Sequence, residues 1–111
     1  MVDRPLREPE VNKLLRLVMK YAGTELYLKA GAVPSMRLRS ERRPISLPPL
    51  SQEDLQLLLS PILDEQQQRA LEEAGRVNLT HAVDQSRFQM RVIKQHGQLR
   101  LIAQNLGGWD S

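Results

Sequence analysis

Apolar residues near the start of the chain recur with the period of a helix. Four of them follow the i, i+3, i+4, i+7 spacing that forms one apolar stripe: Val11, Leu14, Leu15 and Val18. We expect this helix to begin near Pro9, because proline is accepted in the first helical turn. We expect it to end at Gly23, because glycine enters the left-handed conformation at low cost.

Strands are predicted where apolar and polar residues alternate, since alternate side chains of a strand share a face. Five such segments occur, at 24–29, 35–39, 76–83, 87–95 and 99–104. The first two form a hairpin with a longer loop, and His96-Gly97 makes a tight turn between the last two. The alternation directs Phe88 into the core with Met90, Leu26 and Leu28, and it makes His81 a structural histidine.

Between the two groups of strands the pattern returns to helices. Ser51 with Asp54 and Asp64 with Gln67 have the spacing of capping boxes, so each pair should open a helix. Ser60-Pro61 should kink or end the first of these helices, and Gly75 should close the second, which covers 65–74. The resulting order, with an optional further strand after residue 39, predicts an α+β fold. We expect a mainly antiparallel sheet with helices packed on one face.

Composition and charge exclude several classes of function. The 111 residues favour a single domain, with 16 Lys+Arg against 13 Asp+Glu and no cysteine. No GxxxxGK[ST] loop occurs, and two histidines are too few for a metal site. We therefore expect no catalysis by the chain itself, no cofactor and no metal. We also expect a cytoplasmic protein without membrane insertion, because the start has no signal-peptide pattern and the apolar runs are short.

Arginine is the most distinctive residue of the chain. The predicted strands turn five arginines toward the polar side of the sheet, where they are candidates for binding a partner or a phosphate: Arg37, Arg39, Arg87, Arg91 and Arg100. Arginine forms bidentate contacts with carboxylates and phosphates, and a rigid sheet would hold several of them in place. The alternative is a merely solvated face, because exposed charge pairs usually contribute little. The net charge of +3 is small for a nucleic-acid-binding module and counts against that function.

The order of short motifs resembles the N-terminal domain of the PilT-type twitching-motility ATPases, of the type II/IV secretion ATPase superfamily. That family has a helix of the ELL type, a strand written ASDLHL, then SAGxPPMxR, LPPL, an EQ-containing helix ending in EE, and RFRVN. The corresponding segments here are VNKLL at 11–15, GTELYL at 23–28, KAGAVPSMRL at 29–38, LPPL at 47–50, EQ at 65–66, EE at 72–73 and RFQMR at 87–91.

The resemblance implies a PAS-like fold over residues 9–106, with a flexible lead-in at 1–8 and a flexible tail at 107–111. In the family this domain packs on the ATPase domain of a neighbouring subunit in a hexameric ring, and its arginines approach the bound nucleotide. Arg87 matches the family's strand arginine and Arg37 an arginine of its first hairpin, whereas Gln89 departs from the pattern.

The expected function is a non-catalytic interaction or regulatory domain, whose partner is a pilus or secretion motor ATPase or a second copy of itself. One alternative is an excised fragment of a hexameric ATPase that contributes arginines to a neighbouring ATP site. The family's Walker motifs have no counterpart in these residues. The other alternative is a small nucleotide- or nucleic-acid-binding module.

Overall fold

The computed structural model describes residues 9–108, and its centre is one six-stranded antiparallel sheet. The strand order is β3-β2-β1-β6-β5-β4. The strands are β1 (Glu25–Lys29), β2 (Ser35–Leu38), β3 (Glu41–Pro44), β4 (Arg76–Val83), β5 (Ser86–Gln95) and β6 (Gln98–Gly108). The chain thus forms two antiparallel three-stranded units, which meet where β1 pairs with β6.

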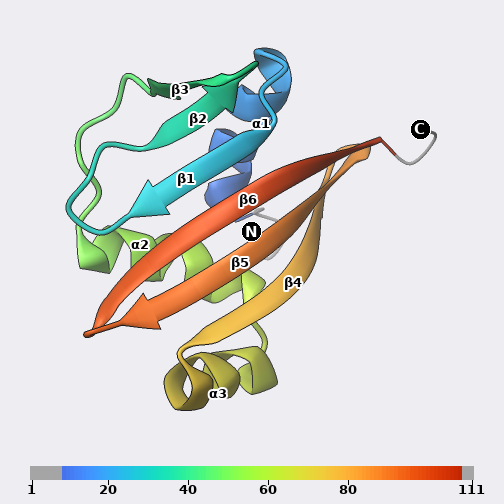
Figure 1. Ribbon diagram of the computed structural model, residues 1–111. Helices are drawn as coiled ribbons and strands as arrows, with labels where there is room; N and C mark the ends of the chain where they lie inside the picture. The colour runs from blue at the N-terminus through green and yellow to red at the C-terminus, as the bar shows by residue number, and fades with distance from the viewer. Residues whose placement is uncertain (1–8, 109–111) are drawn as a thin grey trace, which may run out of the picture.

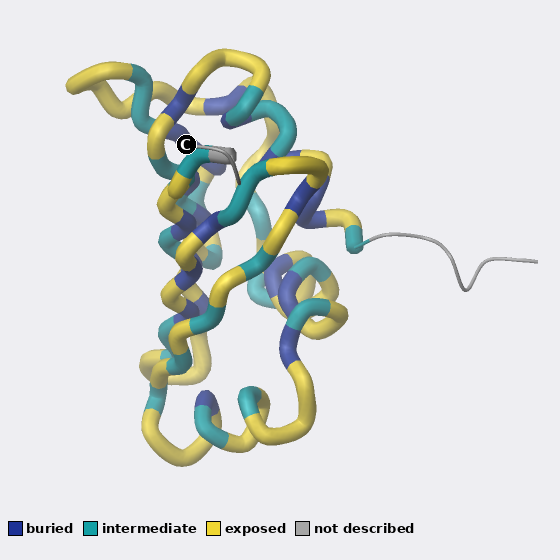
Figure 2. Tube along the Cα trace, turned by 90° about the vertical axis from the view of Figure 1, so that its right-hand side faces the viewer, coloured by how far each residue is buried: buried dark blue, intermediate teal, exposed yellow. Residues whose placement is uncertain are grey.

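Three helices lie on one side of this sheet (Figures 1 and 2). They are α1 (Val11–Lys20), α2 (Gln52–Leu59) and α3 (Glu65–Ala74), with a short 3₁₀ turn at Ser60–Ile62 between the last two. In Figure 1, α1 and α2 lie behind the sheet, and α3 lies beside the start of β4. The expected α+β fold, a mainly antiparallel sheet with helices on one face, is confirmed. The helices leave the other face of the sheet open.

The core lies between the helices and the inward side chains of the sheet. Phe88, Met90 and Leu26 are completely buried there, and Leu28 is almost so, as the alternation predicted. The helices contribute the apolar stripe of α1 together with Leu55 and Leu59 of α2. His81 also faces this side, with its Nε2 2.7 Å from Asn12 Oδ1 on α1, which confirms its structural role. Burial lowers the pKa of His81, because a low-polarity environment disfavours the charged imidazolium.

Local signals set the ends of α2 and α3. Asp54 N–H donates to Ser51 Oγ at 3.0 Å, and Ser51 N–H donates to Asp54 Oδ2 at 2.9 Å. The pair at Asp64 and Gln67 forms the same reciprocal box. α2 ends one residue before Ser60-Pro61, and Gly75 closes α3 in the left-handed conformation. Both capping boxes and both helix ends confirm the predictions.

The end of α1 differs from the prediction. The helix ends at Lys20, and Ala22, with φ of 57°, takes the left-handed conformation that we expected of Gly23. Gly23 is instead required by packing: a Cβ atom there would lie 3.1 Å from the carbonyl oxygen of Arg37 and 3.2 Å from the Val18 side chain. The glycine therefore lets the chain pass closely between α1 and β2.

Two strand boundaries also differ. The optional strand is present as β3, which forms the sheet edge and pairs with β2. β6 continues through Gly108, beyond the predicted end of the domain at 106, because Arg87 and Ser86 pair with Gly107 and Gly108. A bulge between Arg87 and Phe88 accommodates this extension. The predicted lead-in at 1–8 and the rest of the predicted tail, 109–111, lie outside the described residues.

Candidate functional site: the basic face of the sheet

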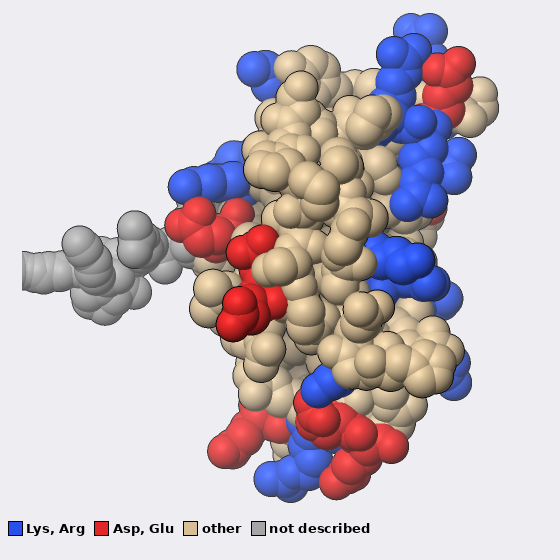
Figure 3. All heavy atoms as spheres, turned by 90° about the vertical axis from the view of Figure 1, so that its left-hand side faces the viewer, with Lys and Arg blue, Asp and Glu red and all other residues tan. Residues whose placement is uncertain are grey.

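The open face of the sheet carries a concentration of positive charge. Alternate residues of each strand point away from the helices, and strand pairing places them side by side. These outward positions include the residues that we call the basic face: Lys29, Arg37, Arg42, Arg76, Arg87, Arg91 and Arg100. Among the outward strand positions of residues 9–108, Glu25 is the one acidic side chain. Figure 3, an edge-on view, shows Lys and Arg gathered along its right-hand side, which is the front of Figure 1.

One part of the basic face is held by a hydrogen-bonded cluster on β1 and β2. Arg37 Nε donates to Glu25 Oε1 at 3.1 Å and to Tyr27 Oη at 2.9 Å, and the Tyr27 hydroxyl donates to the same Glu25 oxygen. The hydrogen bond from Tyr27 and the neighbouring Arg37 lower the pKa of Glu25, although burial opposes them. Burial and the bond to Glu25 raise the pKa of Tyr27. The cluster therefore keeps Glu25 ionised and Tyr27 protonated.

Arg42 extends this arrangement from the edge strand β3. Its guanidinium lies 4.1 Å from the centroid of the Tyr27 ring, and its Nε donates to Ser35 Oγ at 2.8 Å. Stacking on an aromatic face and a hydrogen bond at Nε together limit the motion of a long side chain. Arg42 is thus preorganised, with its two terminal nitrogens remaining as donors.

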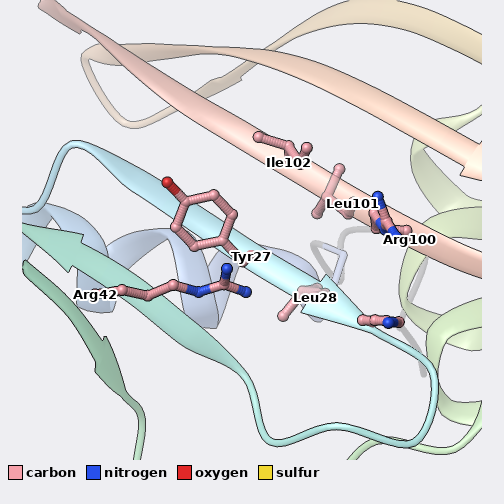
Figure 4. Close-up of a pocket in the computed structure, with 7 residues that line it drawn as sticks. Tyr27, Leu28, Arg42, Arg100, Leu101 and Ile102 are labelled. Carbon is pink, nitrogen blue, oxygen red and sulfur yellow. The ribbon is translucent and has the colours of Figure 1, made fainter.

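A shallow hollow of about 280 Å³ lies next to this stack (Figure 4). Its lining residues come from three strands: Tyr27, Leu28 and Lys29 of β1, Arg42 of β3, and Arg100, Leu101 and Ile102 of β6. Three of these seven side chains are cationic and none is acidic. The hollow is suited to an anionic group next to a small apolar one.

The structure brings together four of the five arginines selected from the sequence. Arg37, Arg91 and Arg100 lie at outward positions of β2, β5 and β6, and Arg87 lies on the same side of β5 at the bulge. Arg39 does not join them. It lies in the turn between β2 and β3 with φ of 59°, and it lines a separate hollow beside Tyr21 at the end of α1. The strand predicted over 35–39 ends at Leu38, so the alternation that selected Arg39 stops before it.

Three cations of the basic face were missed as site residues. Lys29 and Arg76 follow the alternation of their predicted strands, so their outward direction could have been read from the sequence. Arg42 could not, because every residue of β3 is exposed and an edge strand of this kind shows no alternation. Only the contact of its guanidinium with the Tyr27 ring shows that Arg42 belongs to the basic face.

The described residues offer few other chemical possibilities. Within residues 9–108, no group of three or more His, Asp or Glu side chains is placed to hold a metal ion. None of the helices in this range is long and apolar enough to cross a membrane. The cations of the basic face have the chemistry to contact negatively charged groups, because guanidinium and ammonium groups form charge-assisted hydrogen bonds with carboxylates and phosphates.

Comparison with known proteins points to one group of relatives. No protein-family model matches the chain. The type IV pilus ATPase PilU of Pseudomonas aeruginosa is 35% identical over 69 residues, which are 62% of this chain and 18% of PilU. The type IV pilus retraction ATPase PilT of the same organism is 27% identical over 88 residues, 78% of this chain and 26% of PilT. The chain thus spans only 18% of the length of PilU and 26% of the length of PilT.

Solved structures give the same result. A crystal structure of the pilus retraction motor PilT with bound ADP superposes with a TM-score of 0.80 at 25% identity, covering 90% of this chain and 30% of PilT. The Legionella pneumophila ATPase DotB superposes with a TM-score of 0.75 at 13% identity, covering 95% of this chain and 31% of DotB, which shows the shared fold. In both sequence and fold, the chain is similar to the N-terminal domain of PilT-type ATPases.

Proposed function

We propose that this domain is a non-catalytic protein-interaction domain that binds a PilT- or PilU-type motor ATPase through its basic face. The observation that carries the proposal is the joint occurrence of two features. The chain is similar to a part of these motors, and its sheet presents seven cations on a face that no helix within residues 9–108 covers. Within a ring-forming family, such a face is suited to contact with another subunit.

The physical basis of the proposal is preorganisation. Arginines that project from a paired sheet lose less conformational freedom on binding than arginines on a loop. Arg37 and Arg42 are already fixed by Glu25, Tyr27 and Ser35. A partner with carboxylates at matching positions would gain charge-assisted hydrogen bonds with little additional ordering.

A titration tests this function. The chain, labelled with a fluorophore at its N-terminus, is titrated with the PilT- or PilU-type ATPase encoded in the same genome. The matched variants are Arg91→Gln/Arg100→Gln on the basic face and Lys13→Gln/Arg69→Gln on exposed positions of α1 and α3. Both variants remove two positive charges, so they separate the position of the charge from its amount.

We expect the basic-face variant to bind at least about tenfold more weakly than wild type, because the loss of one charge-assisted hydrogen bond weakens binding by about this factor. The helix variant should bind within about threefold of wild type. Equal binding by the folded basic-face variant would contradict the proposal. So would tight binding of ADP by the domain alone, because that result would make it a nucleotide-binding module.

A further inference from the structure

Lys29 and Arg100 form a like-charged pair at the centre of the basic face. They are directly opposite each other where β1 pairs with β6, and both are exposed. Like charges at opposed positions of neighbouring strands repel and destabilise the sheet. Neither side chain forms an ion pair with an acidic residue within residues 9–108. The sheet therefore carries an uncompensated repulsion at this position.

A second like-charged pair on the same face provides an internal comparison. Arg37 and Arg42 are also opposed, on β2 and β3. Glu25 stands directly opposite Arg37 on the other side and forms an ion pair with it at 3.1 Å. The chain thus supplies its own carboxylate to one of the two cationic pairs and leaves the other without one.

Lys29 and Arg100 line two hollows, which together form a depression around the pair. The hollow of about 280 Å³ beside Tyr27 shares both residues with a second hollow of about 180 Å³, which extends toward His96. Ile102 lines the first hollow and Ile93 the second, and no acidic residue lines either. The stacked guanidinium of Arg42 borders the first hollow, on the same side as Tyr27 (Figure 4).

We propose that Lys29, Arg100 and Arg42 form a subsite for an extended acidic segment of the partner protein, with carboxylates at alternate positions and an apolar residue nearby. The proposal deepens the function proposed above and rests on it. The guanidinium of Arg42 lies over Tyr27, two residues from Lys29 on the same face of β1. Two residues of a strand span about 7 Å. Carboxylates at positions i and i+2 of an extended segment have this same separation.

The lining favours protein carboxylates over phosphates. Phosphate sites commonly use several backbone N–H groups from a glycine-rich loop or a helix N-terminus. Here the depression lies over paired strands whose backbone N–H groups belong to the sheet ladder, and its walls include Tyr27 and Ile102. An apolar side chain between two acidic ones would cover Ile102, whereas a polyphosphate would leave it uncovered.

The first test uses a defined probe. A fluorescein-labelled peptide of about ten residues, with glutamates at alternate positions separated by threonine and valine, is titrated with the full chain at low salt. A control peptide has the same composition with its glutamates adjacent. We expect tighter binding of the alternating peptide, weakened at least about tenfold by Lys29→Gln/Arg100→Gln and within about threefold by Lys13→Gln/Arg69→Gln. Equal effects of the two double variants would overturn the proposal, as would displacement of the peptide by pyrophosphate at lower concentration than by unlabelled peptide.

A charge reversal separates binding from folding. Lys29→Glu places opposite charges at the pair with Arg100, so the variant should have a higher melting temperature than wild type and bind the alternating peptide at least about tenfold more weakly. A lower melting temperature, or unchanged peptide binding, would overturn the proposal. Loss of ATPase binding in Arg91→Gln/Arg100→Gln but not in Lys29→Glu would refute this subsite and leave the proposed function standing. Peptide binding without ATPase binding would refute the proposed function instead.

Discussion

Removing the Phe88 side chain gives a quantitative test of the fold. Phe88 is the one phenylalanine of the chain, and it is 0% exposed at the centre of the sheet–helix core. It lies on β5, which pairs with both β4 and β6, so its surroundings are held by strands on both sides. We expect a cavity at Phe88→Ala to close only partly, because the sheet cannot move into it.

The expected magnitude follows from this burial. Truncation of a buried phenylalanine to alanine lowers the free energy of unfolding by about 3–5 kcal/mol, the sum of lost transfer energy and the remaining cavity. The total free energy of unfolding of a domain of this size is roughly 5–15 kcal/mol. Phe88→Ala should therefore leave a protein that is folded but less stable, or one that is close to unfolding. Phe88→Leu keeps most of the volume and should cost below about 1.5 kcal/mol.

Urea denaturation followed by far-ultraviolet circular dichroism measures these changes. The slope of the free energy against urea should stay constant, while the midpoint of Phe88→Ala falls by more than about 1 M. Leu57→Ala is the control, because Leu57 is a large apolar residue that is 74% exposed, and it should stay within about 0.5 kcal/mol of wild type. A cost of less than about 1 kcal/mol for Phe88→Ala would refute the placement of Phe88 in the core.

Four further predictions concern the cap, the acidic cluster, the buried histidine and ATP. Asp64→Ala removes one side of a capping box and should lower stability by about 1 kcal/mol, measured by urea denaturation, whereas a change below about 0.3 kcal/mol would refute the cap's contribution. Glu25→Gln removes the carboxylate that pairs with Arg37, so the free energy of unfolding should fall by less than about 1 kcal/mol at low salt and by a smaller amount at high salt. A loss of stability that does not depend on salt would contradict the ion pair as its cause. The folded-state pKa of His81 lies below its ordinary value of 6.5, so protonation favours the unfolded chain, and stability should fall as the pH drops below about 6.5 in wild type but less in His81→Gln. The isolated chain should release no phosphate from ATP, because no Gly-Lys phosphate loop occurs in it; turnover lost on mutation of one of its own residues would refute this.

The fold was largely predictable because its local signals agree with one another. The helical stripe at Val11–Val18, the capping residues Ser51 and Asp64, and the alternation around Phe88 all indicate elements that the structure contains. The exceptions lie where packing overrides a local preference. Gly23 suggested a left-handed cap, but its lack of a side chain serves the close approach of α1 and β2, which depends on a distant strand.

The candidate site was only partly predictable, because it depends on pairing between strands far apart in sequence. Alternation shows that Lys29 and Arg100 point outward, yet it does not show that they are directly opposite each other. The stack of Arg42 on Tyr27 joins an edge strand to β1 across β2, and the sequence contains no local signal for it. The sequence also placed Arg39 on the strand, whereas β2 ends at Leu38 and Arg39 lies in the following turn.

The central claim is that the basic face, not the helical side, contacts the motor ATPase. The chain has no cysteine, so one introduced cysteine provides a single attachment point for a photo-crosslinker. Gln104→Cys places it on the open face between Glu25 and Gln89, and Glu73→Cys places it on the exposed surface of α3. Irradiation with the PilT- or PilU-type ATPase should give a crosslinked product from Gln104→Cys and little from Glu73→Cys. A product from Glu73→Cys alone would contradict the account.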